Sequence, residues 1–239
     1  MSGLHSDGRL YLCVSKLQFK LKNREANVLV ILRNRQMNSK LWKLWILTAP
    51  IWATAGLPAM AAANPPAVVE NLCSVYHGPG GNSISPRFPR LAAQQPEYLE
   101  AQLKAFRDHT RADPDARDFM WGWARLLSDA DIKQIAAYYA SQKPVPGLSG
   151  NPVLVARGKT IYEFGIPSHS VPACVVCHQA NAEGKDLFPR LASQHAAYTV
   201  KQLEVFHSSL RPAAVAMGAI VTGITNDDAE AIAAYLQSR

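Results

Sequence analysis

The sequence lacks a charge excess over most of its length, although the whole 239-residue chain carries a formal net charge of +7. Nine of its 25 lysines and arginines, but only two of its 18 acidic residues, lie in residues 1–63, which leaves sixteen of each beyond that point. Proteins that bind nucleic acid need a basic surface that attracts phosphates. The neutral remainder therefore excludes nucleic acid as an expected partner.

Cysteine and methionine are also scarce beyond residue 63. This part of the chain holds three of the four cysteines (Cys73, Cys174 and Cys177) and two of the five methionines (Met120 and Met217). Cys174 and Cys177 belong to the motif described below, so no pair of cysteines remains for a structural disulfide. No stretch alternates apolar and polar residues as half-buried strands do, so we expect an all-α fold.

The N-terminal region has the parts of a secretory signal peptide in their usual order. After Met37, two lysines precede an apolar run and two small-residue cleavage sites, at Ala61 and Ala63. We therefore predict a signal peptide at 37–63, a true start at Met37 and a periplasmic protein, with residues 1–36 as an extension ahead of that start. In the alternative interpretation the extension is cytoplasmic and the run is kept as a membrane anchor, although it is short for a span.

A C-x-x-C-H motif is formed by Cys174, Cys177 and His178. This pattern is the attachment signature of c-type haem, in which each thiol adds to a haem vinyl group as a thioether and the histidine ligates the iron. Two cysteines three positions apart lie on one face of a helical turn. A zinc ribbon would need a second cysteine pair, and a thioredoxin-like pair would need a βαβ context; the sequence has neither.

The remainder of the chain contains two copies of one unit. Residues 88–94 recur as residues 188–194, Phe-Pro-Arg-Leu-Ala-x-Gln in both, and a Tyr-x-x-x-Gln-Leu-x-x-Phe pattern follows each copy at the same offset of 100. Met120 and Met217 occupy matching positions further along. Two such copies indicate tandem domains of the same kind.

Each copy closes with apolar residues at helical spacing. Ser128 with Asp131, and Thr225 with Asp228, have the spacing of helix N-caps paired with an acid one turn on. The two patterns predict where both closing helices start.

On these motifs the chain resembles the dihaem cytochromes c of the cytochrome c4 type, over roughly residues 67–239. The resemblance implies two tandem class I cytochrome c domains, each wrapped around one haem c. They would span residues 64–143 and 153–239, joined by a linker at 144–152 that is rich in proline and glycine.

The resemblance also implies the iron ligands. In that family the motif histidine and a distal methionine hold each iron, which by position gives His77 with Met120 and His178 with Met217. Independently of the family, a methionine at matching places in both repeats is unusual for simple core filler.

Further residues around each haem follow from the same resemblance. Pro89 and Pro189 would offer their carbonyls to the axial histidines and so fix the rings. Arg90 and Arg190 are candidate partners for the haem propionates. Histidines outside the motifs are expected to face solvent or to bond locally: His109, His169, His195 and His207.

The first motif departs from the pattern, because Tyr76 stands where the second cysteine belongs, between Cys73 and His77. We expect two haems, with the first tethered by Cys73 alone, since an empty pocket would cost a small domain its core. Two alternatives stay open: the first domain binds haem weakly or not at all and is vestigial, or the tyrosine is a sequence error.

The predicted function is electron transfer, not catalysis, because both axial positions of each iron would be filled. The family typically passes single electrons from a quinol-oxidising complex to a terminal oxidase, so redox proteins, including membrane respiratory complexes, are the expected partners. One alternative is the cytochrome subunit of a dehydrogenase, such as a sulfide-oxidising flavocytochrome c with its flavoprotein subunit. A second is a sensor or enzyme with an open iron.

Overall fold

The computed structural model describes residues 66–208 and 210–239. The predicted extension, signal peptide and cleavage sites lie outside these residues. The described ranges belong to one compact unit. They are helical, with two isolated β-bridges and no named strand, which confirms the prediction of an all-α fold. Within the same ranges, no helix has the length and apolar character needed to cross a membrane.

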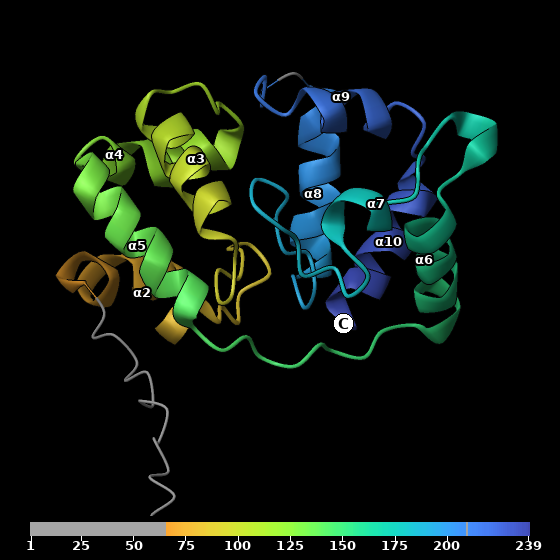
Figure 1. Ribbon diagram of the computed structural model, residues 1–239, viewed down its shortest axis with the longest axis horizontal. Coiled ribbons are helices and arrows are strands. Elements are labelled where there is room, and N and C mark those ends of the chain that lie inside the picture. The colour runs from red at the N-terminus through yellow and green to blue at the C-terminus, as the bar shows by residue number, and fades with distance from the viewer. Residues whose placement is uncertain (1–65, 209) are drawn as a thin grey trace, which may run out of the picture. The chain divides into compact units, whose positions relative to one another are not determined.

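The α-helices that hold the histidine motif, follow it and close the unit recur in the same order in both repeats (Figure 1). The first repeat has η1 (Val69–Cys73), α2 (Ser74–His77), η2 (Pro79–Gly81), α3 (Pro96–Arg107), η3 (Ala116–Met120), α4 (Trp121–Ala124) and α5 (Asp129–Ser141). The second has α6 (Pro152–Phe164), η4 (Pro167–His169), α7 (Val175–His178), α8 (Ala196–His207), α9 (Val215–Val221) and α10 (Asn226–Gln237). The recurring helices are α2, α3 and α5 in the first repeat and α7, α8 and α10 in the second.

Both closing helices begin with a capping box. The Ser128 side chain accepts a hydrogen bond from the Asp131 N–H and the Asp131 carboxylate accepts one from the Ser128 N–H, at the start of α5. Thr225 and Asp228 form the same pair at the start of α10. The predicted starts of both helices are confirmed, because the two side chains satisfy main-chain donors that a helix start leaves unpaired.

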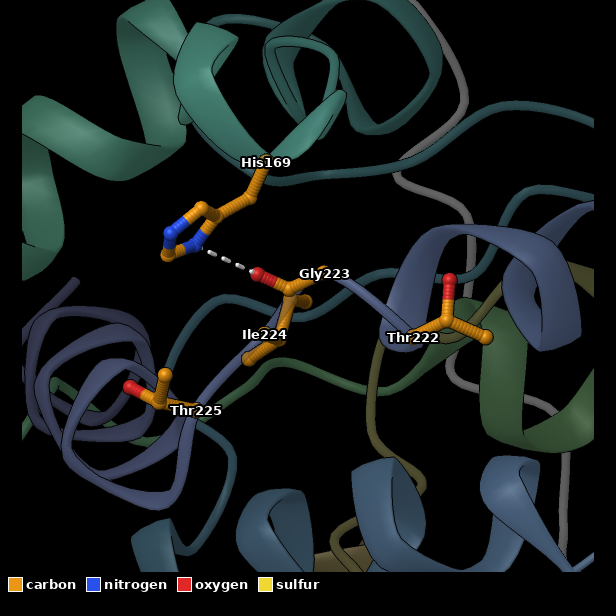
Figure 2. A pocket seen from close by; sticks show the side chains of 5 residues that line it. All are labelled: His169, Thr222, Gly223, Ile224 and Thr225. Carbon is orange, nitrogen blue, oxygen red and sulfur yellow. Dashed lines mark hydrogen bonds between the residues drawn. The ribbon is translucent and has the colours of Figure 1, made fainter.

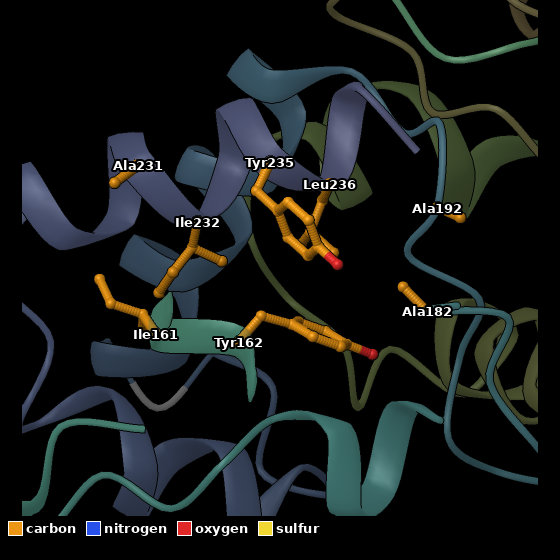
Figure 3. Packing of buried hydrophobic residues seen from close by; sticks show 8 residues of the cluster. All are labelled: Ile161, Tyr162, Ala182, Ala192, Ala231, Ile232, Tyr235 and Leu236. Atoms are coloured by element: carbon orange, nitrogen blue, oxygen red, sulfur yellow. The ribbon is translucent and has the colours of Figure 1, made fainter. Parts of the chain in front are cut away.

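The core of the second repeat lies where α6 crosses α10. Figure 3 shows Tyr162 of α6 beneath Tyr235 and Leu236 of α10, and all three are buried. The helices approach closely because Gly158 has no side chain; any Cβ there would collide with the Ala231 carbonyl oxygen. Helix α6, the first helix of this repeat and here called its entrance helix, is therefore held tightly against the closing helix α10.

The first repeat has a smaller counterpart of this crossing. Its entrance helix is short, and Val69 is fully buried against Ile135, Ala136 and Tyr139 of α5. Helix α3 packs on α5 in the first repeat as α8 packs on α10 in the second. Each repeat thus brings its histidine motif, its middle helix and its closing helix together.

Reciprocal hydrogen bonds join the two repeats. Gln95 donates from Nε2 to the main-chain oxygen of Glu183 at 2.8 Å. One hundred positions later, His195 donates from Nε2 to the main-chain oxygen of Ser83 at 2.9 Å. Matching residues therefore make matching contacts in opposite directions, as expected where two copies of one unit face each other. The prediction that His195 faces solvent or bonds locally was wrong, since its partner is 112 positions away.

Candidate functional site

The second motif lies on a single helical turn. Cys174 is the N-cap of α7, and Cys177 and His178 lie within that helix. Both thiols are free and half-buried, and burial raises the pKa of Cys174 to about 11. A thiol with such a pKa stays protonated at neutral pH and is a poor redox nucleophile. Among the described residues no three His, Cys, Asp or Glu side chains converge as a metal cluster would require. These features fit thioether attachment better than a dithiol redox pair or a zinc site.

The two motif histidines are held in the same way. His77 donates from Nδ1 to the carbonyl oxygen of Pro89 at 2.9 Å, and His178 donates to that of Pro189 at 3.0 Å. A carbonyl can only accept, so Nδ1 carries the proton and the lone pair lies on Nε2. Burial lowers the pKa of both rings, which keeps them neutral. No described residue bonds to either Nε2, and each ring therefore offers one unoccupied lone pair of the kind that ligates iron.

The two methionines occupy matching apolar clusters. Met120 ends η3 and is half-buried against Phe106 and Trp121. Met217 lies in α9 and is half-buried against Leu203 and its neighbours. A thioether sulfur is a soft ligand suited to haem iron. Each repeat thus contains one candidate imidazole ligand and one candidate sulfur ligand.

The arginines after the two prolines differ in their bonding. Arg90 donates to the main-chain oxygens of Ser83 and Ser193 through its guanidinium group. Arg190 is half-buried, and its Nε is a buried donor without a partner among the described residues. A buried donor is costly unless it meets an acceptor, and a haem propionate would supply one. This unmet donor is what a site that receives a haem propionate would contain.

Tyr76 packs into an aromatic cluster that has no counterpart among the described residues of the second repeat. Its ring lies 5.2 Å from that of Phe88, edge to face, and 6.2 Å from that of Phe119. The position that matches Phe119 in the second repeat is Ala216. The tyrosine thus has an aromatic neighbour that its cysteine counterpart lacks, while the histidine beside it keeps its bond to proline.

Two glutamines bind beside these prolines, and sequence reasoning missed their role. Gln94 accepts the Arg190 N–H at Oε1 (2.7 Å) and donates from Nε2 to the Arg190 carbonyl (3.0 Å). Gln194 makes the same two bonds with Arg90, at 2.9 and 3.0 Å. Their recurrence in the repeated Phe-Pro-Arg-Leu-Ala-x-Gln pattern was a signal, but nothing local shows that each side chain reaches the other repeat.

The remaining histidines have other environments. Figure 2 shows the His169 ring directed at the main-chain oxygen of Gly223, 3.1 Å from Nδ1, beside a shallow hollow lined by residues 222–225. None of the predicted haem residues lines this hollow. His109 stacks on Trp121 with ring centroids 4.0 Å apart, and His207 is exposed.

Comparison with known proteins finds relatives that cover most of this chain. The Cytochrome c family matches residues 155–239. "Cytochrome c-552" of Acidithiobacillus ferridurans is 36% identical over 225 residues, which cover 92% of this chain and 97% of that protein. "Cytochrome c4" of Thiocapsa roseopersicina is 38% identical, with 72% of this chain and 88% of that protein covered.

A further relative and one solved structure extend the comparison. The "thiosulfate dehydrogenase electron acceptor" of Thiomonas intermedia is 32% identical over 81% of this chain and 88% of that protein. The solved structure of cytochrome c4 from Acidithiobacillus ferrooxidans is 40% identical in sequence and superposes with a TM-score of 0.66. The superposition covers 70% of this chain and 98% of that one.

Proposed function

The chain belongs to the cytochrome c4 family, electron-transfer proteins of tandem class I cytochrome c domains that carry haem c, and from this premise we propose that it is a periplasmic dihaem carrier of single electrons between redox proteins. Haem c supplies reversible one-electron exchange at its iron. The observation that carries the proposal is the matched pair of histidine bonds, 2.9 Å to Pro89 and 3.0 Å to Pro189. Equivalent imidazole orientation in both repeats supports two sites of one kind.

In the second site we assign Cys174 and Cys177 to covalent attachment, and His178 and Met217 to the two axial positions of the iron. Pro189 holds the proton of His178 at Nδ1. Two protein ligands leave no open position for a substrate, which suits a carrier. Val176, between the two cysteines, is 73% exposed, so apolar surface is available beside the attachment point for a redox partner.

In the first site we infer that Cys73 alone forms a thioether, while His77 and Met120 take the axial positions. The bond from His77 to Pro89 supports this, because the ring is oriented as in the complete motif. The packing of Tyr76 against Phe88 and Phe119 also supports it, since the tyrosine is accommodated without loss of that bond. One covalent link keeps the local concentration of haem high.

The intact mass of the secreted, acid-unfolded holoprotein tests the number of haems. We expect two haem masses on the wild-type chain, and one on a Cys73→Ser variant, whose first haem would be released on unfolding. A Tyr76→Cys variant should keep two haems and shift the first haem's absorption to shorter wavelength, because a second vinyl group becomes saturated. One haem mass on the wild type, together with an acid-acetone extract of the folded protein that contains no haem, would show that the first domain is empty.

The N-terminal proposals have a separate test. We infer that residues 37–63 are removed on export, that domains at 64–143 and 153–239 are joined by a linker at 144–152, and that Met37 is the start. N-terminal sequencing of the periplasmic fraction should find a chain that begins near Ala62 or Asn64. A mature protein that retains Leu10 to Lys22 would contradict export by this segment.

A second candidate function is the electron-accepting partner of a dehydrogenase. It is favoured by the similarity to the thiosulfate dehydrogenase electron acceptor of Thiomonas intermedia. A sulfide-oxidising flavocytochrome is the related arrangement with a flavoprotein. Pull-down of the tagged holoprotein from the periplasm, followed by a stopped-flow assay of its reduction by the captured dehydrogenase, distinguishes these functions. Reduction by a quinol-oxidising complex with no captured dehydrogenase would favour the free carrier.

A further inference from the structure

The peptide group between Pro189 and Arg190 is hydrogen-bonded at both ends. Its carbonyl oxygen accepts the Nδ1–H of His178 at 3.0 Å, and its N–H donates to Oε1 of Gln94 at 2.7 Å. Carbonyl and N–H belong to one planar, resonance-stabilised unit. Gln94, from the first repeat, therefore lies one peptide group away from the candidate iron ligand of the second repeat.

The corresponding peptide of the first repeat links Gln194 to His77 in the same way. The carbonyl between Pro89 and Arg90 accepts from His77 at 2.9 Å, and the N–H of the same peptide donates to Gln194 at 2.9 Å. Both glutamine side chains are buried, so water does not compete for these bonds. The contacts are crossed, since each glutamine serves the histidine of the repeat to which it does not belong.

Three main-chain groups hold each glutamine amide in place. Besides its two bonds to Arg190, Gln94 accepts the N–H of Gln95 at 3.0 Å, at the start of α3. Gln194 accepts the N–H of His195 at 3.1 Å, at the start of α8. The amide is thus tied to a helix start on one side and to the proline–arginine peptide on the other, and it cannot turn without breaking buried bonds.

We propose that Gln94 and Gln194 are positioning residues for the axial histidine of the opposite repeat and that they lower the reduction potential of that haem. The inference rests on the proposed function, in which His178 and His77 ligate iron. A peptide whose N–H is bonded has more electron density on its oxygen, because hydrogen bonds in a chain polarise one another. The stronger acceptor makes the imidazole more basic, and a more basic ligand favours the oxidised iron.

The test uses the full-length holoprotein and redox titration of each haem. The Gln94→Met variant keeps the side-chain volume and removes the acceptor. We expect the second haem to become easier to reduce, with the equilibrium constant for its reduction by a fixed mediator raised about two- to fivefold. The first haem should be unchanged. Gln194→Met should instead make the first haem easier to reduce and leave the second haem unchanged.

A matched control separates positioning from loss of the contact between the repeats. Gln95→Met removes the 2.8 Å bond to Glu183, which joins the same two repeats but does not touch the Pro189–Arg190 peptide. It should leave the potential of the second haem unchanged. Proton NMR of the reduced protein adds an independent signal: the His178 Nδ1–H and Arg190 N–H resonances should both move upfield in Gln94→Met and stay in place in Gln95→Met.

A second variant covers failure of Gln94→Met to fold. Gln94→Glu retains an acceptor and adds negative charge, so it should shift the potential of the second haem downward and by more than Gln95→Glu does. Equal potentials in wild type and Gln94→Met, or equal shifts in the Gln94 and Gln95 variants, would overturn the inference while leaving the proposed function intact. A wild-type chain without His/Met-type haem spectra would instead overturn the proposed function, and the inference with it.

Discussion

Arg111 and Arg211, at matching positions of the two repeats, donate to the same two glutamine side chains. Arg111 bonds to Oε1 of Gln102 and of Gln202, each at 2.9 Å. Arg211 bonds to the same two atoms, at 2.9 and 2.7 Å. Both guanidinium groups are buried. The repeats are therefore joined by a buried polar cluster whose two charges lie on opposite sides of the contact.

This cluster has an unequal charge balance. Asp113 is fully buried and pairs with Nε of Arg111 at 3.0 Å, whereas no ion pair of the described residues includes Arg211. The cluster thus contains two guanidinium cations and one carboxylate. Because a buried charge is costly without a partner, the cluster depends on Asp113.

We predict that Asp113→Asn lowers the free energy of unfolding by about 3 kcal/mol or more, since it leaves the buried guanidinium group of Arg111 without its carboxylate. Chemical denaturation of the holoprotein measures the change. Asp129→Asn is the control, because Asp129 pairs with Arg107 on the surface, where solvent screens the pair, and this substitution should cost much less stability. Equal losses in the two variants would contradict the role given to Asp113.

The crossing of α6 and α10 gives a second prediction. A methyl group on Gly158 meets the Ala231 carbonyl, which belongs to rigid backbone. Gly158→Ala should therefore destabilise the second repeat by about 1–3 kcal/mol, although alanine is the better helix former. Thr160→Ala, on the exposed side of the same helix, should change stability by less than about 0.5 kcal/mol. Thermal unfolding compares the two, and an unchanged midpoint in Gly158→Ala would refute close packing here.

The stability of the protein should depend on pH through His195. Burial, together with the nearby charge of Arg90, lowers the pKa of His195 below its ordinary value near 6.5. The unfolded chain then binds this proton more readily than the folded chain, so stability is full above about pH 6.5 and falls as the pH drops toward the lowered pKa. The loss from one such proton is at most about 1.4 kcal/mol per pH unit.

His195→Gln isolates this effect. Glutamine already makes the equivalent bond at the matching position, from Gln95 to Glu183, so the variant should keep the contact without titrating. Denaturation at pH 7.5 and pH 5 should show a smaller loss in His195→Gln than in the wild type. The same loss in both proteins would assign the pH dependence to other groups.

Removal of an axial sulfur gives a prediction on ligand binding. Met217→Ala should open one iron position, so that the reduced protein binds one carbon monoxide at neutral pH while the wild type binds none. Leu203→Ala, from the same apolar cluster, is the control for loss of packing and should leave both axial positions of the iron filled. Carbon monoxide difference spectra decide the matter; no binding by Met217→Ala would mean that another group ligates this iron.

Local spacing was enough to predict much of this protein. The capping boxes at Ser128 and Thr225 placed two helix starts, because a cap and its partner lie within one turn. The haem motif and the repeat predicted the family. The caps and the haem motif involve residues close together in the sequence, and the repeat recurs at a fixed offset, so all of them can be recognised from the sequence alone.

The sequence by itself determined the all-α class, the family and the candidate haem residues, since each depends on spacing along the chain. Only the tertiary structure decided that Gln94 reaches Arg190, that His195 reaches Ser83 and that Arg111 reaches Gln202. These partners lie in different turns or in different repeats. Which buried donors meet which acceptors depends on how the two repeats pack against each other, and no local pattern encodes that geometry.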